Sequence, residues 1–284
     1  MHLQAIIIRA ALRFQTRPFT WIFRAYYGLA IRSSRWLVGR VPGVRSIYLS
    51  GSLAGEDVIY GLSDIDFKIF VSGDRTPAVY RSIRRRFRLL RRLFPMLGSP
   101  DEKGIYFLDS FASEYAHYPL VRHLFDERFF RHRRIFGEDV IRLLPVKPWQ
   151  ELDQGECAHG RLKDWIERIH ILADGDALGG QQKQHLFFKA VCDVALLAIR
   201  IRRPDFEFRR RADILRRILP ELNEADRALA ENLIAENGSR YRWKRNGDGD
   251  NYRLFKSMVA LCGERAACGG EVEASFPQIE SCVA

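Results

Sequence analysis

The sequence predicts an α+β protein, in which an N-terminal α/β domain is followed by an all-helical domain. Three observations predict this fold class. Short apolar runs typical of strands alternate with helical segments as far as about residue 146. Pro145 and Pro148 then interrupt the pattern. From Glu151 to Ala235, apolar residues recur only at the three- and four-residue spacing of helices, so a sheet domain precedes a helical one.

The composition of the 284 residues indicates a globular protein with a strongly basic surface. Hydrophobic residues make up 47% and aromatic residues 12%, which argues against a disordered chain. The net charge of +11 favours polyanionic partners: nucleotides, nucleic acid or anionic lipid. Five scattered cysteines without metal-ligand spacing indicate free thiols in a reducing cytoplasm. We therefore expect a cytoplasmic protein, and no apolar run reaches the ~18 residues of a transmembrane helix.

Residues 1–40 predict two basic helices, with Pro18 breaking the first or starting the second. Met1 to Gly55 contains no acidic residue but eight arginines. This start resembles an organelle transit peptide, although it is apolar enough to pack on the domain that follows. Its aromatic residues either pack against that domain or anchor the segment on an anionic membrane; they are Trp21, Phe23, Tyr26 and Trp36.

The α/β domain, residues 41–146, is predicted to contain three strands and two helices. The strands are Val44–Leu49, Ile65–Val71 and Lys103–Leu108, and the helices are Ala78–Leu93 and Tyr118–Arg133, the second ending at Phe136-Gly137. The first helix contains seven arginines within Arg81–Arg92. This block is either a solvated helix face or a contact surface for nucleic-acid phosphates or an acidic partner.

The helical domain is predicted to span residues 147–262. It includes a polar loop, Asn237–Asn251, and a short last helix, Tyr252–Cys262. Residues 263–284, rich in Gly, Ala and Glu, are expected to form a mobile tail.

The stretch from Tyr48 to Val71 carries the chemistry. Asp64 and Asp66 stand near the beginning of the second strand. Residues i and i+2 of a strand share a face, so both carboxylates point the same way, about 7 Å apart along the strand. Like charges this close raise each other's pKa unless a cation neutralises them. A hard divalent cation such as Mg²⁺ suits this pair.

Gly51 and Ser52 follow the first strand and suit a phosphate. Gly51 has no side chain, so the backbone can approach an anion closely. Backbone N–H groups at such a turn can hold phosphate oxygens, and Ser52 adds a hydroxyl donor. Because Mg²⁺ in proteins commonly binds substrate phosphates as well as carboxylates, the two features together predict a site for a nucleoside triphosphate.

The GS dipeptide, an eleven-residue gap and DID on a strand resemble the signature of the DNA polymerase β-like nucleotidyltransferase superfamily. The likeness is strongest to small bacterial nucleotidyltransferases, including the aminoglycoside-modifying kind, and it covers residues 44–72 well and 73–140 loosely. It implies a nucleotidyltransferase domain with a small mixed sheet and a helical domain after it. It also implies transfer of a nucleoside monophosphate, with ATP as the expected donor, Gly51, Ser52 and Ser63 at the nucleotide, and Asp64 and Asp66 at the metal.

The superfamily usually has a third carboxylate on a later strand, which binds metal or helps to deprotonate the acceptor hydroxyl. Asp109, at the end of KGIYFLD, is the expected third catalytic and metal-binding residue, with Glu102 and Glu114 as alternatives. Asp109 departs from the usual pattern because Ser110, not an apolar strand residue, follows it. The likeness also implies a lysine of the helical domain at the triphosphate, and we expect Lys189 in that role unless it forms a solvated pair with Asp193.

Two functions of different classes therefore follow from the sequence. The first is a Mg²⁺-dependent nucleotidyltransferase that moves a nucleoside monophosphate onto the hydroxyl of an unidentified acceptor. The second is a catalytically inactive relative whose basic surface binds nucleic acid or protein. An enzyme acting on RNA ends is a weaker third reading, because no separate RNA-binding motif is recognisable.

Overall fold

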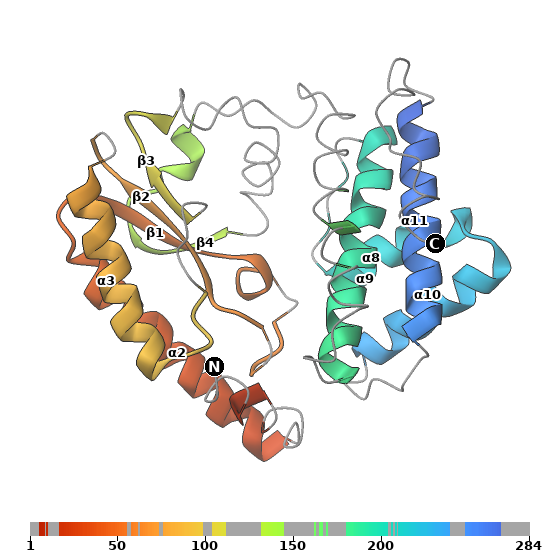
Figure 1. Ribbon diagram of the computed structural model, residues 1–284, viewed down its shortest axis with the longest axis horizontal. Helices are drawn as coiled ribbons and strands as arrows, with labels where there is room; N and C mark the ends of the chain where they lie inside the picture. The colour runs from red at the N-terminus through yellow and green to blue at the C-terminus, as the bar shows by residue number, and fades with distance from the viewer. Residues whose placement is uncertain are drawn as a thin grey trace. The chain divides into compact units, whose positions relative to one another are not determined.

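The structure is a computed structural model, and it divides into two compact units, Met1–Val146 and Lys147–Ala284. Figure 1 shows the chain, and each unit is considered separately below. The residues that the structure describes are 6–8, 10, 17–55, 58–61, 63–73, 76–98, 104–111, 132–144, 162, 165–166, 169, 180–203, 206, 208, 210–238 and 248–267.

The first unit is built on a four-stranded mixed sheet with the order β3-β2-β1-β4. Strand β1 pairs antiparallel with β2 on one side and with β4 on the other, whereas β3 runs parallel to β2. The strands are β1 (Val44–Ser50), β2 (Asp66–Val71), β3 (Ile105–Phe107) and β4 (His132–Gly137). The predicted α+β fold with a small mixed sheet is therefore confirmed.

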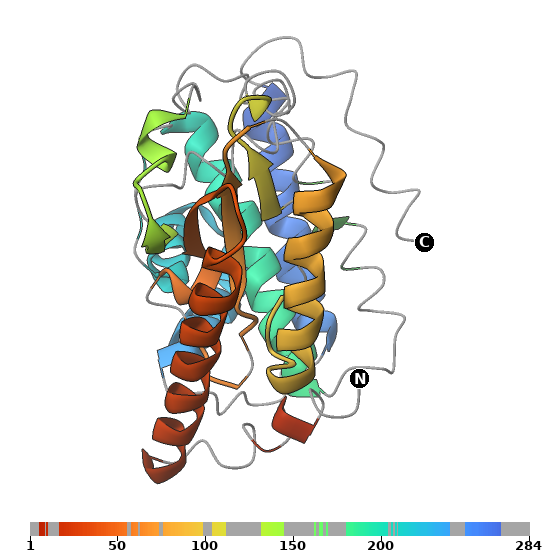
Figure 2. The same cartoon turned by 90° about the vertical axis from the view of Figure 1, so that its left-hand side faces the viewer.

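Two helices cover one face of this sheet. Helix α2 (Arg17–Gly39) and helix α3 (Pro77–Leu93) pack against each other and against the sheet (Figures 1 and 2). Alternate strand residues form the apolar core beneath them: Ile47, Leu49, Phe67, Ile69 and Val71. Pro18 lies in the first turn of α2 and Pro77 begins α3, positions where the missing N–H of proline costs nothing.

The opposite face of the sheet carries a smaller aromatic cluster. Phe70 stacks on Tyr106 with their ring centroids 5.3 Å apart, and Tyr48 meets the edge of Phe70. The Tyr48 hydroxyl donates to the Asp139 carboxylate at 2.9 Å. It also accepts from the backbone N–H of Ile141, the first residue of the short helix η3 (Ile141–Leu143). The same strands therefore face two different environments.

Strand β4 corrects the sequence prediction. A helix was expected over Tyr118–Arg133, ending at Phe136-Gly137, but His132–Gly137 pairs with β1. Residues 112–131 lie outside the described part of the chain. The segment HRRIFG is rich in arginine, which favours helix, and its strand state depends on a partner more than eighty residues away in sequence. Tertiary pairing overrides local propensity here.

The second unit is helical, as predicted. Helix α8 (Gly180–Arg202) is buried on almost every side and packs against α11 (Asp248–Ala267) and α9 (Arg211–Ile218). Helix α10 (Glu224–Gly238) follows the short helix η5 (Leu219–Glu221) and packs on α9 and α11. Helix α11 is longer than the predicted Tyr252–Cys262, and residues 268–284 lie outside the described part. None of the described helices is both long and apolar enough to cross a membrane.

Substitution of Gly137, the last residue of β4, tests how closely the backbones of β4 and β1 approach each other. Its φ is +73°, and a Cβ there would overlap the carbonyl oxygen of Arg45. Gly73 has a φ of +81° but open space around it. We expect Gly73→Ala to lower the free energy of unfolding by about 1 kcal/mol, the cost of the left-handed backbone.

For Gly137→Ala we expect a loss of more than about 3 kcal/mol, because the overlap is added to the same backbone cost. Urea denaturation of both variants measures the difference between them. Equal losses in the two variants would contradict the close β1–β4 approach.

Candidate functional site

The pairing of β1 with β2 brings the Gly51-Ser52 turn next to Asp66, the first residue of β2. Ser50, the last residue of β1, is paired with Asp66, the first residue of β2. The chain turns immediately after Ser50 into the short helix η1 (Gly51–Leu53). Gly51 adopts a φ of +66°, which favours glycine, and Ser52 is only 7% exposed. The two halves of the sequence motif therefore meet at one end of the β1–β2 pair.

The Asp66 carboxylate lies between two glycines. A Cβ added to Gly51 would lie 3.4 Å from Asp66 Oδ2, and one added to Gly98 would lie only 2.6 Å from Asp66 Oδ1. The second distance is shorter than any ordinary Cβ contact, so Gly98 is needed for this position of the carboxylate. Backbone, not side chains, therefore borders Asp66 on these two sides.

The residue between the two aspartates fixes the face on which they lie. Ile65 is fully buried among the apolar residues beneath α2 and α3. Its N–H donates to the Met96 carbonyl at 2.8 Å, and its carbonyl accepts from the Gly98 N–H at 3.0 Å. Because side chains alternate along a strand, Asp64 and Asp66 both project from the opposite face, where both are exposed.

The loop that leads to Asp64 is fastened to helix α2 by Tyr27. The Tyr27 hydroxyl donates to the Ser63 carbonyl and accepts from the Gly61 N–H at 3.0 Å. Burial raises the pKa of Tyr27, and the negative charge of Asp64 raises it further. The phenol therefore stays protonated and keeps donating at any physiological pH.

Ser63 braces the same loop from within. It is fully buried, and its hydroxyl accepts from the Ile59 N–H at 2.9 Å. The structure thus places Ser63, expected at the nucleotide, in the interior of the loop.

Lys68 stands two residues after Asp66 on the same face of β2. Its side chain is 8% exposed, and Nζ donates to the Tyr106 hydroxyl at 2.8 Å. Nζ also lies 5.1 Å from the centre of the Tyr106 ring. A buried cation about 7 Å along the strand from Asp66 offsets part of the negative charge of the aspartate pair.

Asp109 is not brought to the aspartate pair. Strand β3 runs parallel to β2, with Ile105 beside Ile69 and Phe107 beside Val71. Asp109 follows β3 and is exposed at the end of the sheet opposite Asp66, roughly 17 Å or more away at 3.3 Å per residue. Glu102 and Glu114, the two alternatives, lie outside the described residues.

Lys189 lies in the second unit, within a polar stripe on the inner part of α8. The stripe comprises His185, Lys189 and Asp193, spaced four residues apart, and Asp193 forms an ion pair with Arg211 at 3.6 Å. Burial lowers the pKa of His185 well below its ordinary value, and the charges of Lys189 and Arg211 lower it further. The side chains of Asp193 and Arg211 are 15% and 8% exposed, so this ion pair is largely shielded from solvent.

The residues at the aspartate pair suit Mg²⁺. This ion keeps several waters and commonly binds through one or two carboxylates plus substrate phosphates. Two exposed carboxylates on one face, with a glycine turn beside them, provide such a half-site. Within the described residues, no group of three or more His, Cys, Asp or Glu side chains is placed to hold a metal ion.

The sequence interpretation missed Tyr27, Lys68 and Gly98. Tyr27 belongs to a helix that precedes the motif, and nothing in its spacing points to the loop at residues 59–63. Gly98, three residues after Pro95, resembles an ordinary helix-terminating glycine. Of these three residues, only Lys68 could have been identified from the sequence. It follows Asp66 by two residues on a strand, so the two side chains share a face.

We predict that Gly98→Ala displaces the Asp66 carboxylate with little loss of stability. The atom in the way is the end of a movable side chain, so the fold need not change and the free energy of unfolding should fall by less than about 1 kcal/mol. Affinity for Mn²⁺, measured by electron paramagnetic resonance, should fall at least about tenfold. Gly263→Ala, with open space at its Cβ, is the matched control. Unchanged Mn²⁺ affinity in Gly98→Ala would refute the close approach of Gly98 to the Asp66 carboxylate.

Removing the Tyr27 hydroxyl should destabilise the first unit. Tyr27→Phe leaves the Gly61 N–H and the Ser63 carbonyl without this buried partner, at a cost of about 1–3 kcal/mol. Tyr80→Phe, on the partly buried part of α3, provides a comparison outside this loop. Thermal unfolding followed by circular dichroism tests the difference, and equal midpoints for the two variants would contradict the bracing role.

Comparisons with known proteins bear on the fold. No protein-family profile and no curated protein sequence matches the chain. Among solved structures, the chain is similar to spectinomycin adenyltransferase AAD(9) from Enterococcus faecialis, whose crystal structure contains ATP and spectinomycin. The two superpose with a TM-score of 0.55 at 11% sequence identity, over 87% of this chain and 99% of that one. The chain therefore shares the fold of this adenyltransferase, and the α+β fold predicted from the sequence is confirmed.

Proposed function

We propose that this protein is a Mg²⁺-dependent nucleotidyltransferase that moves a nucleoside monophosphate from a nucleoside triphosphate to a hydroxyl group of an acceptor. The observation that carries the proposal is the meeting of the Gly51-Ser52 turn with Asp66 across the β1–β2 pair. The fold supports it, since the similar protein AAD(9) is an adenyltransferase crystallised with ATP. That likeness makes ATP the first donor to test.

Gly51 and Ser52 would bind the phosphates. The opening residues of η1 have backbone N–H groups that the short helix itself does not use. With glycine at the turn, no Cβ stands between these groups and a phosphate oxygen. Lys189, in the second unit, is our candidate for a side-chain cation at the triphosphate.

Asp64 and Asp66 would hold the metal ion. Bound there, Mg²⁺ would neutralise charge on the phosphates and assist in-line displacement at the α-phosphorus with pyrophosphate as leaving group. The chain's own part is positioning: β1 pairing, Ile65 and the Tyr27 contact hold the carboxylates on one face before substrate arrives. Asp109 is left out of this proposal because the register of β3 takes it to the other end of the sheet.

We predict that Asp66→Asn lowers nucleotidyl transfer by at least about 100-fold, since it removes a charge at the reacting centre. Calorimetric titration with non-hydrolysable ATP, GTP, CTP and UTP analogues, with and without Mg²⁺, tests the site before the acceptor is known. Metal-dependent binding of at least one analogue should disappear in Asp64→Asn/Asp66→Asn and persist in the exposed control Glu231→Gln.

Two outcomes would contradict the proposal. If none of the four analogues binds the unmodified protein, the chain is an inactive relative of these enzymes. If nucleic acid binds equally well to the double variant, with affinity that falls steeply with salt, the basic surface and not the aspartate pair carries the function.

A further inference from the structure

We propose that the outer face of the α2–α3 layer docks the protein on an anionic lipid bilayer. This inference is independent of the proposed catalytic activity. It rests on the arginines and the exposed apolar side chains of α2 and α3. These two helices cover the same face of the sheet.

Helix α2 exposes large apolar residues that ordinary packing would bury. Trp21 is 64% exposed and Trp36 56%, and Leu29 is also exposed at 56%. Tyr26, by contrast, packs inward against Phe94. The two alternatives raised by the sequence thus apply to different residues of the same helix: some aromatic side chains join the core, and others face outward.

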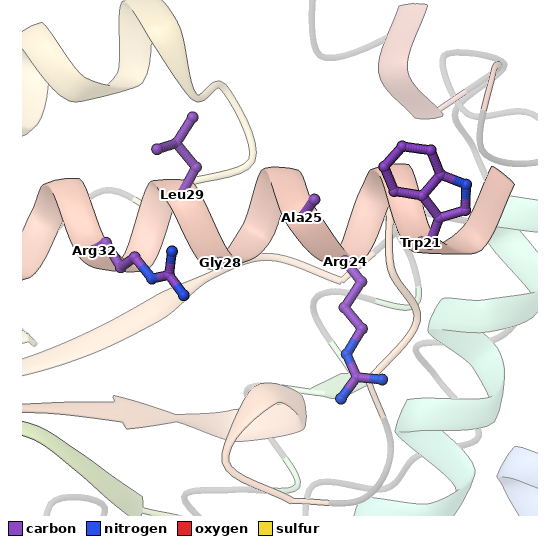
Figure 3. Close-up of a pocket in the computed structure, with 6 residues that line it drawn as sticks. All are labelled: Trp21, Arg24, Ala25, Gly28, Leu29 and Arg32. Atoms are coloured by element: carbon purple, nitrogen blue, oxygen red, sulfur yellow. The ribbon is translucent and has the colours of Figure 1, made fainter.

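Arginines stand between these apolar side chains. Figure 3 shows Arg24 and Arg32 extending from one side of α2, and Trp21 and Leu29 from the other. Together with Ala25 and Gly28 they line a hollow of about 470 Å³. Gly28 leaves the middle of the hollow open, since a Cβ there would meet no atom within 4 Å. The hollow is therefore flanked by guanidinium groups that suit a phosphate and by apolar groups that suit acyl chains.

Helix α3 extends the positive charge beside α2. It has no acidic residue, and neither has α2. No ion pair formed among the described residues involves an arginine of α3. Its exposed arginines are Arg81, Arg84, Arg85, Arg88, Arg91 and Arg92. Like charges three and four residues apart oppose helix formation, so a dense negative surface would relieve a repulsion built into α3.

The apolar residues favour lipid over nucleic acid. Leu89 and Leu93 are 50% and 64% exposed among the arginines of α3. Leucine neither stacks on bases nor bonds to phosphates, but it inserts readily at the boundary of headgroups and acyl chains. Tryptophan is enriched at the same depth. A helical surface that combines arginine with exposed Trp and Leu, and lacks acidic residues, matches an anionic membrane surface.

Docking in this way would leave the aspartate pair accessible. Asp64 and Asp66 project from the side of β2 opposite Ile65, which is buried beneath α2 and α3. The helical layer therefore separates the proposed membrane surface from the carboxylates, and the acceptor would reach them from the aqueous side.

Flotation of the full chain with phosphatidylglycerol vesicles, and with phosphatidylcholine vesicles, tests the proposal. We expect binding to the first and not to the second, with a blue shift of tryptophan fluorescence. Arg85→Ser/Arg88→Ser should weaken binding about 25-fold, at about fivefold for each arginine removed. Trp21→Ser/Leu29→Ser should weaken binding at least about tenfold and reduce the blue shift.

The matched control is Arg203→Ser/Arg216→Ser, which removes two exposed arginines from the second unit. We expect it to bind within about twofold of the unmodified protein, and Asp64→Asn/Asp66→Asn to bind as the unmodified protein does. Failure to bind phosphatidylglycerol would overturn the proposal, as would equal weakening by both arginine pairs. Tighter binding to RNA than to vesicles, unaffected by Trp21→Ser/Leu29→Ser, would assign the surface to nucleic acid instead.

Discussion

The first unit holds two negative charges on one face at the start of a short strand. With about 7 Å between them along the strand, Asp64 and Asp66 repel each other by about 2 kcal/mol at an effective dielectric constant near 20. Several features oppose their separation. Ile65 is buried between them, the β1–β2 pairing fixes the start of the strand, and Tyr27 ties the preceding loop to α2. These contacts hold both carboxylates on one face of the sheet, where the proposed Mg²⁺ ion would bind.

Much of this arrangement could be predicted from local sequence. The strands around Gly51-Ser52 and Asp64-Asp66 lie within one or two residues of their predicted limits, because apolar runs bounded by glycine and charged residues decide them. Helix α3 also begins and ends where Pro77 and Pro95 predict. The division into a sheet region and a helical region follows from the same change of periodicity.

The parts that sequence did not reveal depend on contacts between distant segments. Strand β4 exists through its pairing with β1, and Gly98 matters through its approach to Asp66. Asp109 was expected at the site because it ends a strand, but the direction of that strand was not readable from its residues. The parallel register of β3 takes Asp109 to the wrong end of the sheet. Ser63 also lies near the motif in sequence, but its hydroxyl accepts a hydrogen bond from the Ile59 N–H inside the loop.

The arginines of β4 have a consequence for the protein's behaviour at high concentration. Within the described residues β4 is at the edge of the sheet, with backbone groups on its outer side that another strand could use. Arg133 and Arg134 are exposed on it, and a second copy approaching in register would bring the same charges together. The arginines that made this segment look helical in the sequence therefore also discourage edge-to-edge aggregation between chains.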